Sequence, residues 1–518
     1  MVNLLWPDIS AWQHLIDTVL VEYISNSFLL SIGVGLGCLL IGGSTAWCMT
    51  QYQFTLRSVM RWLLLLPLAM PAYIIAYTYT GILDASGPIQ SYLRDSFSWQ
   101  YGDYWFPEVR SLMGAVVLMS LVLYPYVYIL ARTAFAEQSP RLMEASLLSG
   151  LSRWQFLRKV SLPLARPAMF TGVALAMMEA LADYGTVHYF GINTFTTGIF
   201  RSWYAMGNQT LAIQLAGVLC MFVLVVLVLE QHSRKQIRYY QNVNTRQNSS
   251  RRPLSGWKNI LVCLICGLPV VFGFIVPVLQ LLQWALGDFE TLLSMEFLEL
   301  AAASFMLAVA AAIVVVLFAL LFSYQQRWVG SRASYWQIRL LSLGYALPGM
   351  VVAVGVLVVF GYADKQVNQL SFMLSGEYVG LVFSGTLVAA IFAYCVRFLS
   401  IALQNTESGM ARISPSIDDA ASTLGAGRAR SLTKIHAPLL KASLLSALLL
   451  VFVDVLKELP ATLVLRPFNF NTLAVRAYEL ASDERLASAA LPALTIVLVG
   501  LLPILLLTKA LDQTHKES

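Results

Sequence analysis

Long apolar runs separated by short polar segments dominate the pattern of this chain. Several runs approach or exceed the roughly 20 residues that a helix needs to cross the core of a bilayer. Clear examples are LMGAVVLMSLVLYPYVYILA (112–131), AASFMLAVAAAIVVVLFALLFSY (302–324) and ALPALTIVLVGLLPILLL (490–507). We therefore expect an all-α polytopic membrane protein with about eleven transmembrane helices, near 24–49, 62–82, 112–132, 168–190, 210–230, 259–286, 302–324, 338–362, 379–402, 440–465 and 488–508.

Composition agrees with this pattern. Of the 518 residues, 58% are hydrophobic and only 12% are charged, whereas soluble chains carry roughly a quarter charged residues. The first 23 residues have no basic start and no uninterrupted apolar core, so we expect no cleavable signal peptide.

The basic residues predict the orientation of the chain. Lys and Arg cluster after the fifth span, and the segments on the other side lean acidic, as at Asp8, Asp17 and Glu22. Because basic loops stay in the cytoplasm, eleven spans place the N-terminus in the periplasm and the C-terminus in the cytoplasm. The basic cluster comprises Arg234, Lys235, Arg238, Arg246, Arg251, Arg252 and Lys258.

Two polar segments between apolar runs, at 144–163 and 419–438, match each other. The offset is 419 − 144 = 275, and it continues without gaps across both segments and beyond the next span. Six predicted spans separate the copies, so both face the same side of the membrane. The chain is predicted to hold two parallel repeats related by a pseudo-two-fold axis along the membrane normal. Their ranges are 1–250, with about five spans, and 251–518, with about six.

Each copy has the residues of a helix, a bend and a second helix. Ser139 and Ser414 suit an N-cap, followed by Pro140 and Pro415 in the first turn. Gly150 and Gly425 permit a left-handed bend, while Pro163 and Pro438 are expected to stop the second helix. An amphipathic helix on the inner leaflet would explain one copy. Two copies with equal spacing favour two identical docking partners.

The spacing resembles the cytoplasmic loop of permease subunits in binding-protein-dependent ABC importers. The motif Glu-Ala-x4-Gly-x9-Ile-x-Leu-Pro is matched in both copies, with mild departures at Ser146, Val160, Asp419 and Ala437. The resemblance implies coupling loops at 139–166 and 414–441, and two copies of a cytoplasmic ABC ATPase that binds ATP and Mg²⁺. It also implies a periplasmic substrate-binding protein. The matched coupling residues are Glu144, Ala145, Gly150, Pro163, Asp419, Ala420, Gly425 and Pro438.

Two further segments resemble ferric-iron permeases of this class. They are TFTTGIFRSWYAMGNQTLAIQLA (194–216) and KELPATLVLRPFNFNTLAVRAYELASDERLA (457–487). The resemblance implies import of ferric iron across the bacterial inner membrane; thiamine, phosphonate or polyamine permeases and a nucleotide-independent secondary transporter are alternatives. Such permeases often begin with an extra span, so either the start is shortened or the true start codon lies upstream.

Charged residues inside predicted spans repeat at the same offset. Glu179 and Asp183 correspond to Asp454 and Glu458, and Lys457 adds a cation. Burying an ion in a span costs about 2.5–3.5 kcal/mol on the gentlest scale. These groups are expected either to line a translocation path or to form salt bridges between helices.

On the predicted outer side, Arg201 and Arg476 are candidate contacts for the binding protein, or braces of their own loops.

The His and Cys residues form no ligand cluster, so no metal ligands are assigned, and CLIC at 263–266 suits helix packing. The chain contains no Gly-Lys-Ser/Thr phosphate-binding sequence, so we expect no ATP hydrolysis or cofactor in this chain. Lipid should surround it, and no nucleic acid is expected as a partner.

Overall fold

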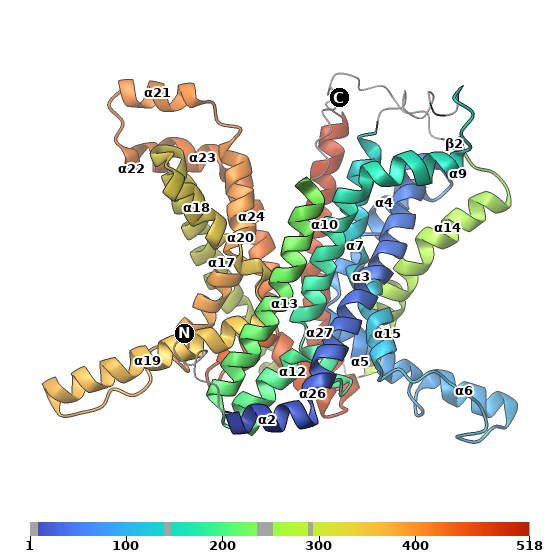
Figure 1. Cartoon of the computed structure of the whole chain (residues 1–518), viewed down its shortest axis with the longest axis horizontal. Coiled ribbons are helices and arrows are strands. Elements are labelled where there is room, and N and C mark those ends of the chain that lie inside the picture. Colours follow the sequence, from blue (N-terminus) through green and yellow to red (C-terminus); the bar gives the residue numbers. More distant parts are fainter. Residues whose placement is uncertain (1–8, 139–145, 147, 236–251, 288–293, 517–518) are drawn as a thin grey trace. The chain divides into compact units, whose positions relative to one another are not determined.

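The computed structural model describes residues 9–138, 146, 148–235, 252–287 and 294–516. The chain forms two compact units, Met1–Leu286 and Gly287–Ser518, and the elements of each are shown in Figure 1. Among the described residues the only strands are the short β1 (Tyr52–Gln53) and β2 (Arg252–Pro253), which pair in parallel in the first unit. Both units are otherwise helical, as the sequence predicts.

The first unit contains the long helices α3, α7, α10 and α13 together with shorter segments. In chain order its helices are α2 (Ile9–Thr18), α3 (Leu20–Gln51), α4 (Arg57–Leu63), η1 (Leu66–Ala69), α5 (Ala72–Leu83), α6 (Pro88–Phe97), α7 (Leu112–Ala136), α9 (Arg153–Phe156), η2 (Leu157–Ser161), α10 (Leu162–Ala182), α11 (Gly185–Tyr189), α12 (Phe195–Phe200), η3 (Arg201–Ala205), α13 (Gln209–Lys235), α14 (Trp257–Val270), η4 (Val271–Ile275) and α15 (Val276–Gly287).

The second unit repeats the same kind of architecture. Its helices are α17 (Met295–Val329), α18 (Arg332–Leu341), η5 (Gly344–Ala346), α19 (Gly349–Ser375), α20 (Leu387–Met410), α21 (Pro415–Thr423), α22 (Arg428–Ser431), η6 (Leu432–His436), α23 (Ala437–Leu439), α24 (Lys441–Leu456), α25 (Pro460–Leu465), α26 (Leu473–Ser482) and α27 (Leu486–Lys516).

Small residues bring α3 and α7 close together in the first unit. A Cβ placed on Gly37 would lie 2.2 Å from Ser120 Oγ, and one on Gly42 would lie 2.7 Å from the Tyr124 carbonyl oxygen. Close backbone approach through small residues is how helices associate where lipid supplies little hydrophobic drive. The glycine run beginning at Gly33 is therefore a packing surface.

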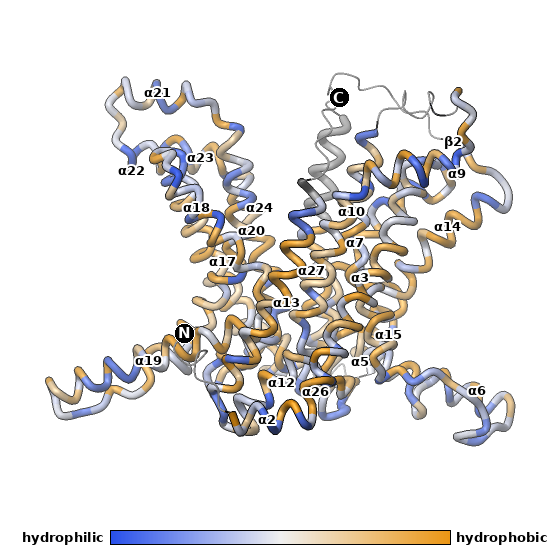
Figure 2. Tube along the Cα trace, in the orientation of Figure 1, coloured by the Kyte–Doolittle hydropathy of each residue, from blue (hydrophilic) through white to orange (hydrophobic). Residues whose placement is uncertain are grey.

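Apolar helices account for the predicted spans, and Figure 2 shows how hydrophobic residues follow them. Within the described residues, nine helices are long and apolar enough to cross a membrane, or eleven if each of two bent pairs is one span. The bent pairs are Arg57–Ala69 with Ala72–Phe97, at 94°, and Arg428–Leu439 with Lys441–Leu456, at 77°.

The expected span at 338–362 is wrong in its position. The chain breaks between α18 and α19, and the apolar helix there runs over Gly349–Ser375. At the break, a Cβ on Gly344 would lie 1.8 Å from the Val396 carbonyl oxygen, so the backbone packs directly on α20. Pro348 then precedes the new helix as its N-cap. Hydropathy alone cannot detect such a break because the residues on both sides are apolar.

The compact units divide after Leu286, whereas the predicted repeats divide after residue 250. The helices α14, η4 and α15 belong to the first compact unit. In that unit Tyr79 Oη donates to the Phe272 carbonyl oxygen at 2.7 Å, and Gly273 packs on the carbonyl of Leu121. A sequence repeat and a compact unit are different divisions of the chain, and the repeat boundary stays a prediction.

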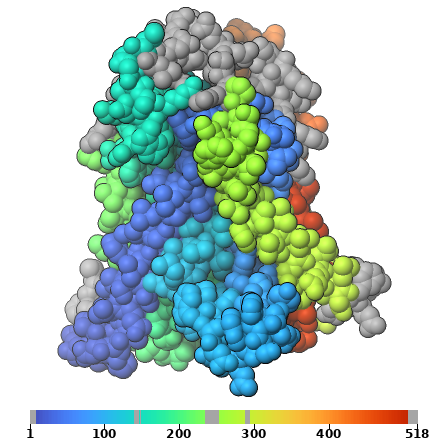
Figure 3. Space-filling view, turned by 90° about the vertical axis from the view of Figure 1, so that its right-hand side faces the viewer, coloured from blue at the N-terminus to red at the C-terminus, as the bar shows by residue number. Residues whose placement is uncertain are grey.

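Each unit carries an arm that leaves its helix bundle. In the first unit the arm consists of α6 and the loop that follows it to Arg110, which stands out as a lobe in the space-filling view (Figure 3). In the second unit it consists of the C-terminal half of α19 and the loop to Gly385 (Figure 1).

Candidate functional site

The second polar loop, 414–441, is described throughout. Ser414 is the N-cap of α21, where its Oγ accepts a hydrogen bond from the Ser416 N–H at 3.4 Å, and Pro415 occupies the first turn. After α21, Gly425 has φ +72°, and the Ala426 N–H donates to the Ala421 carbonyl oxygen at 2.9 Å. A left-handed residue followed by such a bond is the usual way of closing a helix C-terminus.

The described part of the first polar loop closes in the same way. Gly150 has φ +83°, and the Leu151 N–H donates to the Ser146 carbonyl oxygen at 3.1 Å. These are the positions of Gly425, Ala426 and Ala421 shifted by 275. The predicted positions Ser139, Pro140, Glu144 and Ala145 lie outside the described residues.

A π-helical turn follows the bend in both loops. The turns are η2 (Leu157–Ser161) and η6 (Leu432–His436), again separated by 275 residues. Such turns are rare and cluster at functional sites. The sequence analysis missed them because a π-turn has no local residue pattern.

The π-turn also corrects the expectation for Pro163. This proline does not stop a helix, because α9, η2 and α10 run on from Arg153 to Ala182. The wider turn already displaces the usual hydrogen bonds, so a missing N–H is tolerated there. Pro438 behaves differently: α23 ends at Leu439, and the chain bends by 77° before α24.

A polar network ties the second loop to α17. Asp418 Oδ2 accepts from Arg327 Nε at 2.7 Å, and Asp418 Oδ1 lies 2.7 Å from His436 Nε2. Arg327 also donates to the carbonyl oxygens of Met410 and Ile413, at 2.7 and 2.9 Å. His436 is fully buried, so the network joins α17, α21 and η6 into one body.

Apolar packing surrounds this network. Tyr324, Met410, Ile413 and Leu440 form a buried cluster at the C-terminal end of α17. Tyr324 Oη donates to the Arg428 carbonyl oxygen at 2.8 Å. The predicted contact Asp419, next to the half-buried Asp418, is exposed together with Ala420. Leu424 is 87% exposed, so the tip of the loop is free to meet a partner.

Two of the predicted intramembrane carboxylates cap short helices. Asp183 Oδ1 accepts from the Thr186 N–H at 2.9 Å at the start of α11. Glu458 Oε1 accepts from the Ala461 N–H at 3.1 Å at the start of α25. Both accept from the residue three positions on, so the repeat-related carboxylates hold equivalent breaks in the chain.

The remaining charges are placed differently in the two units. Glu458 also pairs with Arg397, and both side chains are at most 8% exposed. Lys457 Nζ lies 2.7 Å from Asp454 Oδ1, while Glu179 is half-buried. Lys457 and Asp454 are three residues apart, so this ion pair lies within one helical segment. Sequence reasoning missed Arg397, which lies in the middle of an apolar run.

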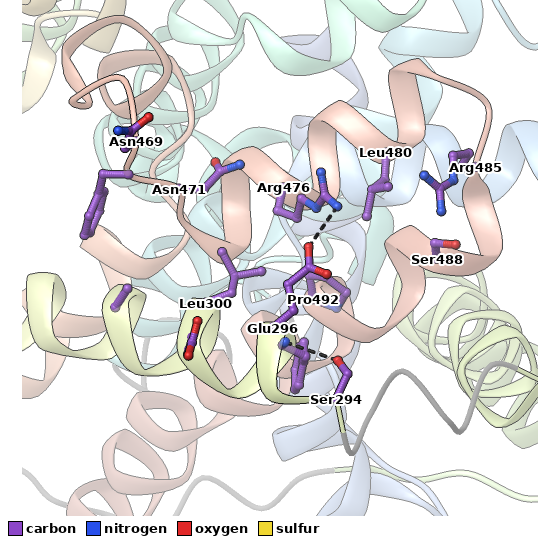
Figure 4. Close-up of a pocket in the computed structure, with 14 residues that line it drawn as sticks. Ser294, Glu296, Leu300, Asn469, Asn471, Arg476, Leu480, Arg485, Ser488 and Pro492 are labelled. Atoms are coloured by element: carbon purple, nitrogen blue, oxygen red, sulfur yellow. Dashed lines mark hydrogen bonds and ion pairs between the residues drawn. The ribbon is translucent and has the colours of Figure 1, made fainter.

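The two arginines of the predicted outer side are braced by neighbours. Arg201 donates to Asn193 Oδ1 at 3.2 Å, and Arg476 Nη2 lies 3.4 Å from Glu296 Oε1. A cavity of about 800 Å³ opens beside Arg476. Its polar lining includes Arg476 from α26 and Glu296 from α17, together with Arg485 from the turn between α26 and α27 (Figure 4).

Metal-ligating side chains do not gather in the part of the chain that the structure describes. There, no three His, Cys, Asp or Glu residues lie close enough to hold a metal ion.

Comparison with known proteins gives the family context of these loops. The family model described as "Binding-protein-dependent transport system inner membrane component" matches this chain twice, over residues 38–231 and 330–516. The chain is 25% identical over 498 residues to the Haemophilus influenzae Fe(3+)-transport system permease protein FbpB 2, covering 94% of this chain and 90% of the relative. It is 24% identical to the Actinobacillus pleuropneumoniae ferric transport system permease protein FbpB, over 86% of this chain and 65% of the relative. The putative molybdenum transport system permease protein YvgM of Bacillus subtilis is 27% identical over 39% of this chain and 88% of its own length.

Proposed function

This chain belongs to the family of binding-protein-dependent transport system inner membrane components. On that premise we propose that it is the transmembrane permease of an ATP-driven ferric-iron importer. The main support is the breadth of similarity. Ferric-iron relatives align over 94% and 86% of this chain, and so over both of its halves. The cargo would pass from a periplasmic binding protein to the cytoplasm.

Transport of iron tests this proposal directly. The chain should be reconstituted in liposomes with its partner ATPase and binding protein, and uptake of radioactive ferric iron measured with and without ATP. Iron uptake that requires ATP supports the proposal. Uptake of molybdate, sulfate or a phosphonate in place of iron would assign another substrate, and uptake without nucleotide would indicate a secondary transporter.

The polar loops are the proposed docking sites for two copies of a cytoplasmic ABC ATPase, which would bind ATP and Mg²⁺. In the second loop, the exposed tip formed by Asp419, Ala420, Leu424 and Gly425 would enter one ATPase subunit. In the first loop, the residues around Gly150 would enter the other. The rigid connection from α21 through Arg327 would carry the motion of the ATPase into α17. Glu144, Ala145, Pro163 and Pro438 complete the proposed coupling set.

The translocation path is proposed to run beside the intramembrane charges Glu179, Asp183, Asp454, Lys457 and Glu458. Carboxylate oxygens are hard ligands suited to a hard cation. Glu179 and Asp454 are the better candidates for transient contact, because Asp183 and Glu458 already hold helix N-termini. Replacing Glu179 by Gln should slow iron uptake while ATP hydrolysis continues.

The binding protein is proposed to dock at Arg201 and Arg476, one for each of its lobes. Arg201 is exposed and Arg476 is partly exposed, so both can also reach a partner. Exposed ion pairs contribute about 0–1 kcal/mol each, so charge reversal of both to Glu should weaken docking mainly at low salt. Unchanged affinity of the double variant at low salt would place the docking surface elsewhere.

The proposed orientation puts the N-terminus in the periplasm and the C-terminus in the cytoplasm. A membrane-impermeant thiol reagent should label a cysteine near Asp8 in intact cells and one near Ser518 only after lysis. Labelling of both ends from the same side would contradict the odd number of spans.

A further inference from the structure

The arm of the first unit turns its polar side chains onto its own loop. Gln90 is buried, and its Nε2 donates to the Leu83 carbonyl oxygen at 2.8 Å. Arg94 Nη2 donates to the Ala85 carbonyl oxygen at 2.6 Å. Tyr104 Oη, from the loop, donates to Gln90 Oε1 at 2.7 Å. These bonds hold α6 and its loop in one shape.

The apolar side chains of this arm face away from the protein. Ile89, Tyr92, Leu93 and Phe97 follow the i, i+3, i+4, i+8 spacing of a helix stripe. Tyr92 is 72% and Phe97 58% exposed. The loop adds Tyr101 and Trp105, at 79% and 87%, so no described part of the chain covers this surface.

The arm of the second unit is built on the same plan from different residues. Asp364 is buried and accepts hydrogen bonds from the N–H groups of Val382, Phe383 and Ser384, at 2.8–2.9 Å. Asn368 exchanges two bonds with Gly380, at 2.7 and 2.9 Å.

Its outer surface is again apolar and aromatic. Met373 and Leu374 are both 80% exposed, and Tyr378 is 69% exposed. Phe372 and Tyr378 stack with centroids 4.9 Å apart, as Phe97 and Trp99 do at 4.7 Å in the first arm. The two arms differ in sequence, yet both have hydrogen-bonded polar side chains on the inside and exposed apolar side chains on the outside.

We propose that these two arms are interfacial anchors whose apolar surfaces lie in the headgroup–acyl boundary of the bilayer, one for each repeat. Trp and Tyr rings are enriched at this depth because their apolar bodies and polar tips suit its two sides. Amphipathic helices of this kind bury their apolar face about 5–10 Å into that boundary. On the orientation proposed above, the boundary belongs to the outer leaflet.

Continuity with the spans favours lipid over a protein partner. The second arm is the uninterrupted continuation of α19, and exposed apolar residues run along it from Val359 through Tyr362 to Leu374. At 1.5 Å per residue, the helix of 27 residues is about 40 Å long, against roughly 30 Å of hydrocarbon. The last ~10 Å of this helix carries the exposed Phe372, Met373 and Leu374, which suits a helix whose end lies at the boundary of the core.

Spin labels test the proposal on the full chain in lipid nanodiscs of phosphatidylethanolamine and phosphatidylglycerol, with its ATPase but without the binding protein. On a variant lacking the six native cysteines, single labels replace Ile89 in one arm and Leu374 in the other. The matched controls Asp95 and Lys365 are exposed and lie about 120° and 180° further round their helices. Accessibility to oxygen and to a water-soluble nickel chelate is then measured.

We expect the ratio of oxygen to nickel accessibility to be several-fold higher at Ile89 and Leu374 than at the two controls. Ser96, exposed and about 20° from Ile89 round the helix, provides a second label site if Ile89→Cys does not insert. Equal nickel accessibility at stripe and control positions would overturn the proposal. So would protection that appears only when the loaded binding protein is added, since the arms would then dock a protein. Neither result depends on which solute is transported.

Discussion

Asp418 provides the sharpest test of how the second loop is held. Replacing Asp418 by Ala removes the acceptor of both Arg327 and His436. The adjacent Asp419 is exposed and its side chain is not part of the network described above, so Asp419→Ala is a matched control. The two variants lose the same charge from the same helix.

The expected loss follows from burial and the number of bonds. A hydrogen bond to a charged group contributes roughly 1.5–3 kcal/mol, and breaking a buried ion pair costs about 3–5 kcal/mol. Asp418 is 21% exposed and Arg327 16%, so solvent reduces these figures. Arg327 also keeps its bonds to the carbonyls of Met410 and Ile413. We therefore expect Asp418→Ala to destabilise the loop by about 2 kcal/mol.

Hydrogen exchange measures this local stability. A loss of about 2 kcal/mol should speed exchange of the amides in 414–436 roughly 30-fold. In the same nanodiscs, Asp419→Ala should leave exchange unchanged, but it should reduce stimulation of the partner ATPase if the exposed tip is the docking surface. Equal exchange in the wild type and Asp418→Ala would show that the network does not hold the loop.

Two further changes test other parts of the chain. Gly425→Asn should keep ATP hydrolysis coupled to transport, whereas Gly425→Val should uncouple them. The reason is that φ at this position is +72°, and Asn tolerates this conformation better than a β-branched residue. Similar coupling in both variants would exclude a need for the left-handed bend. Glu458→Gln should lower the free energy of unfolding in detergent by about 3–5 kcal/mol, because it removes the carboxylate charge that pairs with the buried Arg397. An Arg397→Met/Glu458→Met double variant should recover part of that loss, and a double variant less stable than the single one would contradict this account.

Patterns that depend on local chemistry were predictable from the sequence. Apolar runs gave the spans, and the 275-residue offset gave the two matching loops and the left-handed glycines. Features that depend on packing were not. Asp418 and Asp419 are equivalent in the sequence, and only the approach of Arg327 from α17 decides that Asp418 turns inward. The break near Gly344 is likewise set by contact with α20. The π-turns and the helix that continues through Pro163 depend on which backbone hydrogen bonds form. No local residue pattern predicts that choice.

The matching π-turns also record the history of the chain. A π-turn is equivalent to one residue inserted into an α-helix, and it rotates all that follows by about 100° relative to what precedes it. Both copies carry the insertion at the same position, at 157–161 and 432–436. The simplest history is that a single-repeat ancestor already had this rotation before it was duplicated. The arms diverged afterwards, one adopting Gln90 and Arg94 and the other Asp364 and Asn368. A descendant of that ancestor whose gene was never duplicated should encode a subunit of about half this size. Such a subunit should form its pore as a dimer.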